Sequence, residues 1–151
     1  MLLNTLKSLN LSGSILDVGC GYGVIGIVLK KLFPKIFVTM TDTNRTATEL
    51  AQQNAELNQT KDYKIILSDA YQNIKEKFDY IVSNPPVKAG KKVLYDILIN
   101  AKDHLLKKGN LIFVIKNKFG VKGLIEHLKE TYKTVEIIER KGGFCVVRAG
   151  E

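Results

Sequence analysis

The chain has 151 residues, of which 45% are hydrophobic and 25% charged, and 23 basic against 15 acidic residues give a formal net charge of +8. This length predicts a single domain over residues 1–151. A chain of this size buries roughly 68–70% of the surface that it exposes when unfolded, so it needs neither a disulfide nor a metal ion to stabilise its core. Cys20 and Cys145 lack metal-ligand spacing, so we expect reduced thiols and no metal. The opening MLLNTLKSLNL lacks the basic start and the cleavage site of a signal peptide, and no run approaches the roughly 18 apolar residues of a membrane span. We therefore expect a cytoplasmic protein without membrane contact.

Short apolar runs then alternate with helical patterns along the chain. Runs rich in Ile, Val, Phe and Tyr predict buried strands at Ser14–Val18, Ile36–Thr41, Tyr63–Leu67, Phe78–Ser83 and Asn110–Ile115. Apolar residues at helical spacing predict helices over Val24–Phe33, Arg45–Leu57, Val93–Leu106 and Gly120–Tyr132, with Lys107-Lys108-Gly109 as a stop signal. Finally, Thr134–Arg140 and Phe144–Arg148 flank Lys141-Gly142-Gly143 and predict a hairpin. The fold class is therefore α/β, a doubly wound, mostly parallel, seven-stranded Rossmann-like sheet that ends in an antiparallel C-terminal hairpin.

Polar residues follow each of the five predicted parallel strands. Ligands of an open α/β sheet bind at the carboxyl ends of its strands, so these residues are the candidates for a site. In chain order they are Asp17 with the glycines of DVGCGYG, Asp42, Asp69-Ala70, Asn84-Pro85-Pro86-Val87 and Lys116-Asn117-Lys118.

The glycine loop alone leaves three interpretations open. Gly21, Gly23 and Gly26 have the spacing of a dinucleotide-binding loop, and Asp42 follows Gly23 by 19 positions (42 − 23), close to the acid that binds a ribose in such folds. An NAD-dependent dehydrogenase is thus one alternative to another nucleotide cofactor. The third interpretation is a tight turn with no ligand, with Asp42 as a helix N-cap.

The asparagine and prolines after the fourth strand favour an amine substrate. Pro85 and Pro86 have no N–H donor and leave carbonyl oxygens free to accept hydrogen bonds, and the amide oxygen of Asn84 is a further acceptor. An acceptor-rich corner suits an NH2 group, and hydride transfer has no evident need for it. An isolated Asn-Pro-Pro is more often a strand-terminating turn, but its predicted place beside the glycine loop favours a site.

These motifs resemble those of the class I S-adenosylmethionine-dependent methyltransferases. DVGCGYG is similar to their first motif, Asp42 to the acid of their second, SDA at 68–70 to their adenine-contacting segment, and FDYIVSNPPV at 78–87 to the fourth motif of amino-group methyltransferases. SNPPVKAGKK and LLKKGNLIFVIKNKFG further resemble the small-domain group related to the 16S ribosomal RNA guanine-N2 methyltransferase, the RsmC-like group. The resemblance covers nearly the whole chain.

The resemblance implies a role for each matching residue. Gly19, Gly21 and Gly23 would lie against the methionine and ribose of S-adenosylmethionine, and Asp17 would hold the methionine amino end. Asp42 would accept hydrogen bonds from the ribose hydroxyls and Asp69 one from the adenine amino group, while the Ala70 N–H would face the ring. The Asn84 side chain and the Pro85 carbonyl, with Pro86 next in the chain, would accept hydrogen bonds from the substrate NH2 group. These bonds would favour a pyramidal nitrogen whose lone pair points at the methyl group.

Two departures from the family pattern concern the substrate. Relatives usually have an aromatic residue after the prolines, which stacks on the target base and contributes about 1–3 kcal/mol. Here that position is Val87, so Phe119 and Tyr22 become the candidate stacking residues. Relatives also carry an upstream segment that helps cover cofactor and substrate, whereas this chain begins shortly before its first predicted strand. A non-catalytic module that binds S-adenosylmethionine and RNA therefore remains an alternative to an enzyme.

Five lysines follow the fourth and fifth predicted strands and would give the catalytic face a positive charge. They are Lys88, Lys91, Lys92, Lys116 and Lys118. Their position favours phosphate contacts over an ordinary solvated surface, with RNA ahead of DNA on the resemblance alone. The function that we expect is N-methylation of an exocyclic amine in RNA, with guanine N2 of ribosomal RNA as first choice and the small ribosomal subunit as partner. The main rival is a protein glutamine N5-methyltransferase, although such relatives generally carry Tyr after the prolines and an extra recognition domain.

Overall fold

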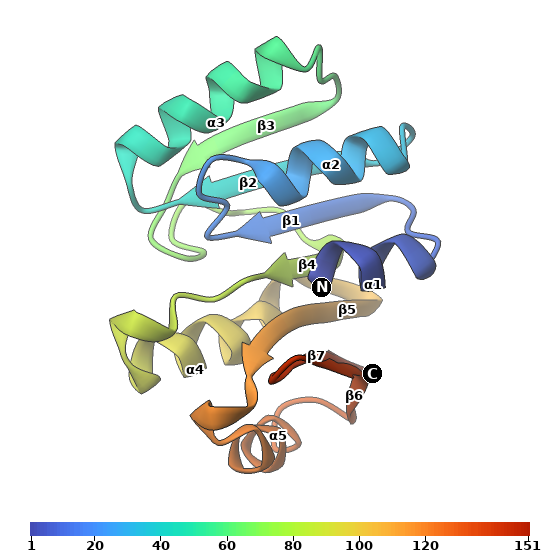
Figure 1. Ribbon diagram of the computed structural model, residues 1–151, viewed down its shortest axis with the longest axis vertical. Helices are drawn as coiled ribbons and strands as arrows, with labels where there is room; N and C mark the ends of the chain where they lie inside the picture. Colours follow the sequence, from blue (N-terminus) through green and yellow to red (C-terminus); the bar gives the residue numbers. More distant parts are fainter.

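A single seven-stranded sheet organises the computed structural model, which describes residues 1–151 (Figure 1). The strands are β1 (Ser14–Val18), β2 (Phe37–Asp42), β3 (Tyr63–Leu67), β4 (Phe78–Ser83), β5 (Leu105–Lys116), β6 (Thr134–Lys141) and β7 (Phe144–Gly150). They lie in the order β3-β2-β1-β4-β5-β7-β6. Neighbours among the first five pair in parallel, and β7 pairs antiparallel with both β5 and β6. The predicted mostly parallel sheet with an antiparallel C-terminal hairpin is confirmed.

Helices cover both faces of this sheet, as expected for a doubly wound fold (Figure 1). The α-helices are α1 (Leu2–Ser8), α2 (Val24–Leu32), α3 (Arg45–Leu57), α4 (Lys91–Asn100) and α5 (Val121–Leu128), and the 3-10 helices are η1 (Val87–Ala89), η2 (Ala101–His104) and η3 (Asn117–Phe119). Helices α1, α2 and α3 contribute to one hydrophobic cluster, whereas α4 and α5 contribute to the other. Adjacent strand residues alternate between the clusters: Ile15 belongs to the first and Leu16 to the second. None of the helices combines the length and apolarity that crossing a membrane requires.

The boundary between α4 and β5 differs from the sequence prediction. The predicted helix over Val93–Leu106 ends at Asn100, and β5 begins at Leu105, which pairs with Phe78. The pairing then shifts, so that Tyr80 faces Asn110 and the intervening residues bulge out. Gly109 is therefore not a helix stop. A Cβ at this position would lie 2.9 Å from the carbonyl oxygens of Leu106 and Phe78, a close approach that only glycine allows.

Both ends of the chain also differ from the sequence prediction. The opening residues, for which the sequence predicted no element, form α1, whose Leu2 and Leu6 are buried. The last helix ends at Leu128, not Tyr132. Tyr132 is buried in the turn that follows, where its hydroxyl donates to the carbonyl of Leu98 at 2.6 Å. Its helical spacing thus reflects burial beyond the end of the helix.

Candidate active site

A cavity of about 320 Å³ lies at the carboxyl ends of β1, β2, β3 and β4. Six of the residues predicted for the site line it: Gly19, Asp42, Asp69, Ala70, Asn84 and Pro86. Further backbone and side-chain surface comes from Val18, Thr41, Thr43, Ser68, Ala89, Val93 and Ile97. The structure therefore brings together residues from four separate strand ends, as the parallel sheet predicts. One wall is polar, and the wall formed by Ala89, Val93 and Ile97 is apolar.

Hydrogen bonds between neighbouring loops fix the strand ends around the cavity. The buried hydroxyl of Ser83 donates to the carbonyl of Val18 at 2.9 Å and ties the end of β4 to the end of β1. The Cys20 N–H donates to the carbonyl of Thr41 at 2.8 Å, which ties the glycine loop to β2. These contacts hold the backbone beside Asn84 and Gly19 in place before any ligand arrives.

Asp42 is half-buried at the end of β2 and organises the glycine loop. Its carboxylate accepts hydrogen bonds from the N–H of Gly21 and from the N–H of Asn44, both at 2.9 Å. The interpretation of Asp42 as a helix N-cap is wrong, because the side chain of Asn44 caps α3 by accepting from the Ala47 N–H. Each Asp42 oxygen retains capacity for another hydrogen bond, so the carboxylate is still able to bind hydroxyl groups in the cavity.

Asp17 is completely buried in β1, and neither of its carboxylate oxygens has a hydrogen-bond partner. Burial raises its pKa from 3.8 to about 7; the nearby Gly26 N–H opposes this effect, and the negative charge of Asp42 adds to it. Asp17 does not line the cavity itself but lies beneath the loop that does. An unpaired buried carboxyl is costly, so this position is suited to binding a cationic or hydrogen-bonding group.

The glycines of the loop have two different roles. Gly19 lines the cavity with φ of +73°, and a Cβ built on it would meet no protein atom within 4 Å, so the space it leaves faces the cavity. Gly26 instead faces the sheet, where a Cβ would lie 2.5 Å from the sulfur of Met40. Gly21 and Gly23 do not line the cavity, and the space beside Gly23 is occupied by Ala51 of α3.

Asp69 and Ala70, which follow β3, form part of the cavity rim. Asp69 is exposed, and Ala70 adopts a positive φ of 47°, which is unusual for a residue with a side chain. The buried Ser68 hydroxyl donates to the Ala70 carbonyl at 2.8 Å and accepts from the Asn73 N–H at 3.1 Å. This small network holds the Ala70 backbone in its strained conformation at the rim.

The Asn-Pro-Pro corner follows β4 as predicted. The exposed side chain of Asn84 makes no hydrogen bond within the chain, so both its oxygen and its amide nitrogen are free. The Pro85 carbonyl already accepts from the Val87 N–H at 2.9 Å, and the Pro86 carbonyl from the Ala89 N–H at 3.0 Å. The corner is thus a turn in part, but a carbonyl oxygen is able to accept a second hydrogen bond.

A second cavity, also of about 320 Å³, meets the first at Asn84. No sequence pattern indicated it. Its other lining residues are apolar: Met1, Leu2 and Leu3 of the α1 region, Ile25 of α2, Val114 of β5 and Phe144 of β7. They come from segments that only the folded topology brings together. The sequence indicated the Gly-Gly turn before Phe144, but it did not indicate which strand of the parallel sheet β7 pairs with.

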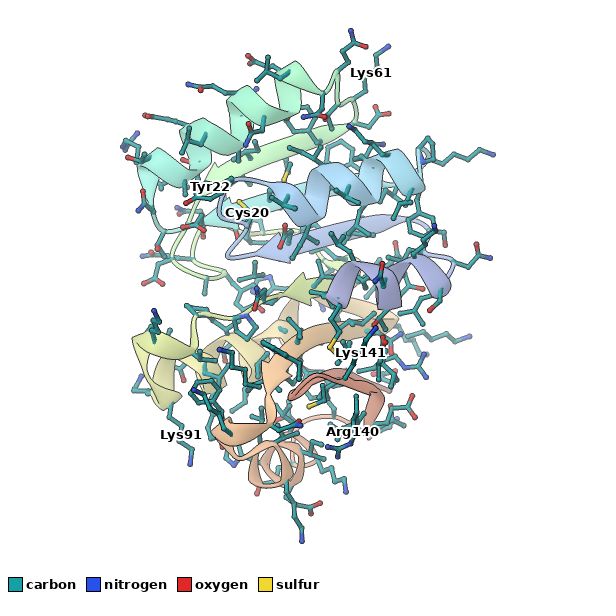
Figure 2. All side chains as sticks on the ribbon, viewed as in Figure 1. Cys20, Tyr22, Lys61, Lys91, Arg140 and Lys141 are labelled. Atoms are coloured by element: carbon teal, nitrogen blue, oxygen red, sulfur yellow. The ribbon has the colours of Figure 1, made fainter.

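The residues predicted to bind substrate are spread over the same edge of the sheet. Lys91 and Tyr22 lie toward the side to which the parallel strands point, whereas Lys61 lies at the opposite edge (Figure 2). All five predicted lysines are exposed: Lys88, Lys91, Lys92, Lys116 and Lys118. One of them, Lys92, pairs with Asp96 at 2.9 Å, and this carboxylate raises its pKa.

The three candidate contacts for the base lie outside both cavities. Val87 is half-buried and packs against the cluster on the α4 side. Phe119, which is 41% exposed, lies under the Lys118 ammonium in η3, and Tyr22 is 61% exposed on the glycine loop. None of the three lines a cavity that contains Asn84.

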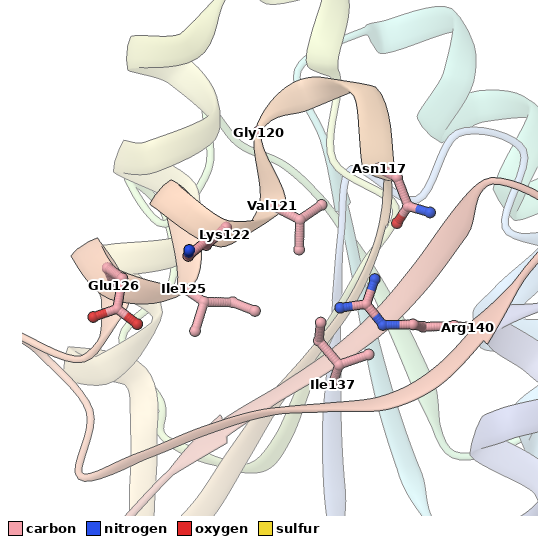
Figure 3. A pocket seen from close by; sticks show the side chains of 8 residues that line it. All are labelled: Asn117, Gly120, Val121, Lys122, Ile125, Glu126, Ile137 and Arg140. Carbon is pink, nitrogen blue, oxygen red and sulfur yellow. The ribbon is translucent and has the colours of Figure 1, made fainter.

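A shallower cleft of about 390 Å³ lies between α5 and β6, away from the ends of β1 to β4. Figure 3 shows the guanidinium of Arg140 pointing into it from β6, across from α5. Asn117, which follows β5, is the only member of the predicted strand-end set that lines it. This cleft therefore contains none of the predicted cofactor residues.

Comparison with known proteins decides which class of cofactor and chemistry this arrangement serves. The model of the methyltransferase small domain family matches residues 1–148. The chain belongs to this family. It is a methyltransferase that depends on S-adenosylmethionine, as the resemblance implied, and the dehydrogenase alternative falls away.

Curated relatives extend over most of the chain. YbxB of Bacillus subtilis strain 168, described as uncharacterized, is 38% identical over 99% of this chain and 75% of its own length. The ribosomal RNA small subunit methyltransferase C proteins of Photobacterium profundum and Aeromonas hydrophila are 36% and 40% identical over 87% and 97% of this chain. The chain spans only 39% and 42% of the lengths of these two enzymes.

Solved structures confirm the methyltransferase fold. The T. thermophilus 16S rRNA methyltransferase RsmC, in complex with AdoMet and guanosine, aligns with a TM-score of 0.86 and 22% identity over 99% of this chain and 42% of that one. A ribosomal protein L11 methylase from Lactobacillus delbrueckii aligns with a TM-score of 0.82 and 24% identity over 99% and 78%. At these identities the likeness shows the fold and not the substrate.

Proposed function

We propose that this methyltransferase transfers a methyl group to an exocyclic amine of a base in RNA, with guanine N2 of ribosomal RNA as the first choice. The observation that carries the proposal is the position of Asn84. Its unpaired side chain lies in the wall shared by the polar strand-end cavity and the apolar cavity. A hydrogen-bond acceptor between a cofactor site and an apolar site is what transfer to the amine of a flat ring requires.

The first cavity, together with Asp17 beneath its glycine loop, has groups that fit S-adenosylmethionine, which when bound supplies a methyl group made electrophilic by its sulfonium. The buried, unpartnered Asp17 carboxyl would bind the amino end of the methionine part. Asp42 retains acceptor capacity for the ribose hydroxyls, and Asp69 is exposed at the rim for the adenine amino group. Val93 and Ile97 offer an apolar surface for the adenine ring.

Asn84 would orient the amine that receives the methyl group. Its side-chain oxygen would accept one N–H of the substrate. The carbonyl of Pro85, a buried residue that adjoins Asn84 but lines neither cavity, would accept the other through its remaining lone pair. Two such bonds favour a pyramidal nitrogen, whose lone pair then projects away from the acceptors. Holding the nitrogen in line with the methyl group, at the roughly 3–3.5 Å of a near-attack geometry, would supply much of the rate enhancement. The methylated nitrogen would carry a positive charge and lose one proton to water, and the cofactor would depart as a neutral thioether, so no strong base is required.

The positive face and the relatives support RNA as the substrate. The exposed lysines follow β4 and β5 at the carboxyl edge of the sheet, the edge at which Asn84 lies, and they would contact phosphates there. Several relatives at 34–41% identity are named ribosomal RNA small subunit methyltransferase C. Guanine N2 is the exocyclic amine methylated by the group that the motifs resemble.

The proposal is tested by incubating the protein with radiolabelled S-adenosylmethionine and separate pools of ribosomal RNA, DNA and protein. We expect label in the RNA pool, and N2-methylguanosine after digestion to nucleosides. An Asn84→Ala variant serves as the matched control, and it should retain cofactor binding by calorimetry while losing transfer. Label confined to protein would support the glutamine methyltransferase, and cofactor and RNA binding without label in any pool would support the non-catalytic module. Either result overturns the proposal.

A further inference from the structure

The apolar cavity beside Asn84 has the features of a nucleobase site. We propose that it receives the target base, and that Phe144 is the residue on which the base stacks, with the ammonium of Lys116 held against Phe144. This inference rests on the proposed function and deepens it, because it names the surface that replaces the aromatic residue missing after the Asn-Pro-Pro corner.

The pairing of β5 with β7 places Phe144 and Lys116 side by side. They are directly opposite in the antiparallel register, so both side chains lie on the same face of the sheet, as does Val114 two residues earlier. The Lys116 ammonium lies 5.5 Å from the centroid of the Phe144 ring. A cation over an aromatic ring is attracted to it, and this contact restrains the long lysine side chain near the cavity.

The face of the sheet also explains why Val87 is not the stacking residue. Val87 packs with the hydrophobic cluster formed by α4 and α5, whereas Phe144 packs with the cluster formed by α1, α2 and α3. Only Phe144 lines the cavity that contains Asn84. A base on Phe144 would therefore have its exocyclic amine close to the Asn84 acceptor while its ring remained in apolar surroundings.

Part of the cavity lining comes from α1 and the residue before it. Leu2 and Leu6 are buried, and the hydroxyl of Thr5 hydrogen-bonds to the carboxylate of Glu139 on β6. These contacts anchor the segment whose first three residues line the cavity together with Phe144. The site thus has an aromatic residue, an aliphatic surface and a polar acceptor at the boundary with the cofactor cavity.

The chemistry of these walls selects a ring over an amide side chain. An aromatic nucleobase would gain stacking energy on Phe144 and cover the apolar residues Ile25 and Val114, and Lys116 beside Phe144 would offer a positive charge to the phosphate of the nucleotide. A glutamine side chain has no ring to place there and no phosphate to pair with the lysine. The cavity therefore favours a nucleotide as the occupant.

A tryptophan reporter tests the stacking directly, because the chain contains no tryptophan. Phe144→Trp places the only tryptophan of the chain in the cavity, where it is excited selectively over the six tyrosines, and Phe37→Trp places one at the start of β2, where Phe37 is 41% exposed and lines neither cavity. Guanosine is titrated into both variants in the presence of S-adenosylhomocysteine. We expect saturable quenching of Phe144→Trp and only the absorption-dependent decrease in Phe37→Trp. An equal decrease in the two variants would overturn the inference.

Transfer kinetics give a second test on the same pair of positions. Phe144→Leu should reduce kcat/KM for RNA about tenfold to hundredfold, the range expected when one base no longer stacks, and Phe144→Tyr should restore it. Phe37→Leu should match the unmodified protein, and the calorimetric affinity for S-adenosylmethionine should be the same in all variants. Unchanged kcat/KM in Phe144→Leu would refute the stacking role.

The two tests separate this inference from the proposed function. Quenching by guanosine without methylation of any RNA would support the base site and overturn the proposed reaction. Methylation of RNA with no quenching and with full activity in Phe144→Leu would support the reaction and overturn the base site.

Discussion

The buried carboxyl of Asp17 makes the stability of the cofactor-free protein depend on pH in a way that Asp17→Asn should remove. Its pKa rises from 3.8 to about 7 on folding, because burial disfavours the charged form. About three pKa units at 1.36 kcal/mol each correspond to about 4 kcal/mol. Because the folded-state pKa is raised, this carboxyl does not destabilise the fold below pH 3.8, where it is protonated in both states. The free energy of unfolding then falls as the pH rises from 3.8 to about 7 and levels off above that value.

The variant isolates this effect from the cost of burying an amide. An unsatisfied asparagine side chain costs about 1–3 kcal/mol, but that cost is the same at every pH. Between pH 5 and pH 8 the pH crosses about two units below the folded-state pKa of about 7, and each unit lowers the free energy of unfolding of wild type by about 1.36 kcal/mol. The stability of Asp17→Asn relative to wild type should therefore increase by about 3 kcal/mol over this interval. Urea unfolding followed by circular dichroism at the two pH values, without cofactor, measures this difference. A difference that stays constant within about 0.5 kcal/mol would refute the reasoning.

Cofactor binding should show the complementary dependence. If the ionised Asp17 binds the methionine amino group, binding below pH 7 requires a proton to leave the carboxyl, and the affinity of wild type should fall about tenfold per pH unit. Asp17→Asn should bind S-adenosylmethionine weakly and without this slope between pH 5 and pH 7. A wild-type affinity that is flat over this interval would show that Asp17 does not contact the charged end of the cofactor.

Three further predictions concern catalysis, RNA binding and packing. Asn84→Ala should lower methyl transfer by about two orders of magnitude or more with little change in cofactor affinity, as for the removal of one positioned transition-state hydrogen bond; wild-type turnover would reduce the corner to a turn. Replacing Lys91, Lys92 and Lys118 with glutamine should reduce the slope of log Kd for RNA against log salt concentration by up to about 0.7 for each single-strand phosphate that is no longer neutralised. The same replacement of Lys35, Lys61 and Lys77, at the opposite edge of the sheet, is the control and should leave the slope unchanged. Gly26→Ala should destabilise the fold, because the new Cβ meets Met40 at 2.5 Å, whereas Gly123→Ala in α5 meets nothing within 4 Å and should stabilise it by up to about 1 kcal/mol, both measured by urea unfolding.

The parallel half of the fold could be predicted from local patterns. The predicted strands Ser14–Val18, Tyr63–Leu67 and Phe78–Ser83 coincide with β1, β3 and β4, and the predicted helix Arg45–Leu57 coincides with α3. Each is short, has a clear apolar period and is bounded by turn residues, so its identity depends little on distant contacts. Because parallel strands align their carboxyl ends, the strand assignments alone placed Gly19, Asp42, Asp69, Ala70, Asn84 and Pro86 together, but not the apolar wall that η1 and α4 supply.

The apolar half of the candidate site depends on contacts that no local pattern reveals. Phe144 and Asn84 line one cavity because β7 inserts between β5 and β6, and this order cannot be read from a hairpin signal. The bulge before Asn110 and the docking of Leu2 and Leu6 likewise depend on partners far away in the sequence. Sequence reasoning therefore assigned stacking to Phe119 and Tyr22, which follow strand ends in the chain but line neither cavity.

The meeting of the two cavities at Asn84 follows from the strand order itself. The chain runs outward from β1 to β3 in one direction and from β4 to β5 in the other, so β1 and β4 are adjacent strands whose following helices, α2 and α4, pack on opposite faces of the sheet. At such a switch point the two helices diverge and leave a crevice at the carboxyl ends. The bond from Ser83 to Val18 closes the floor of this crevice, and Asn84 is the first residue above it. A side chain at that position reaches both faces, which is why one asparagine is able to border a cofactor site and a substrate site at once.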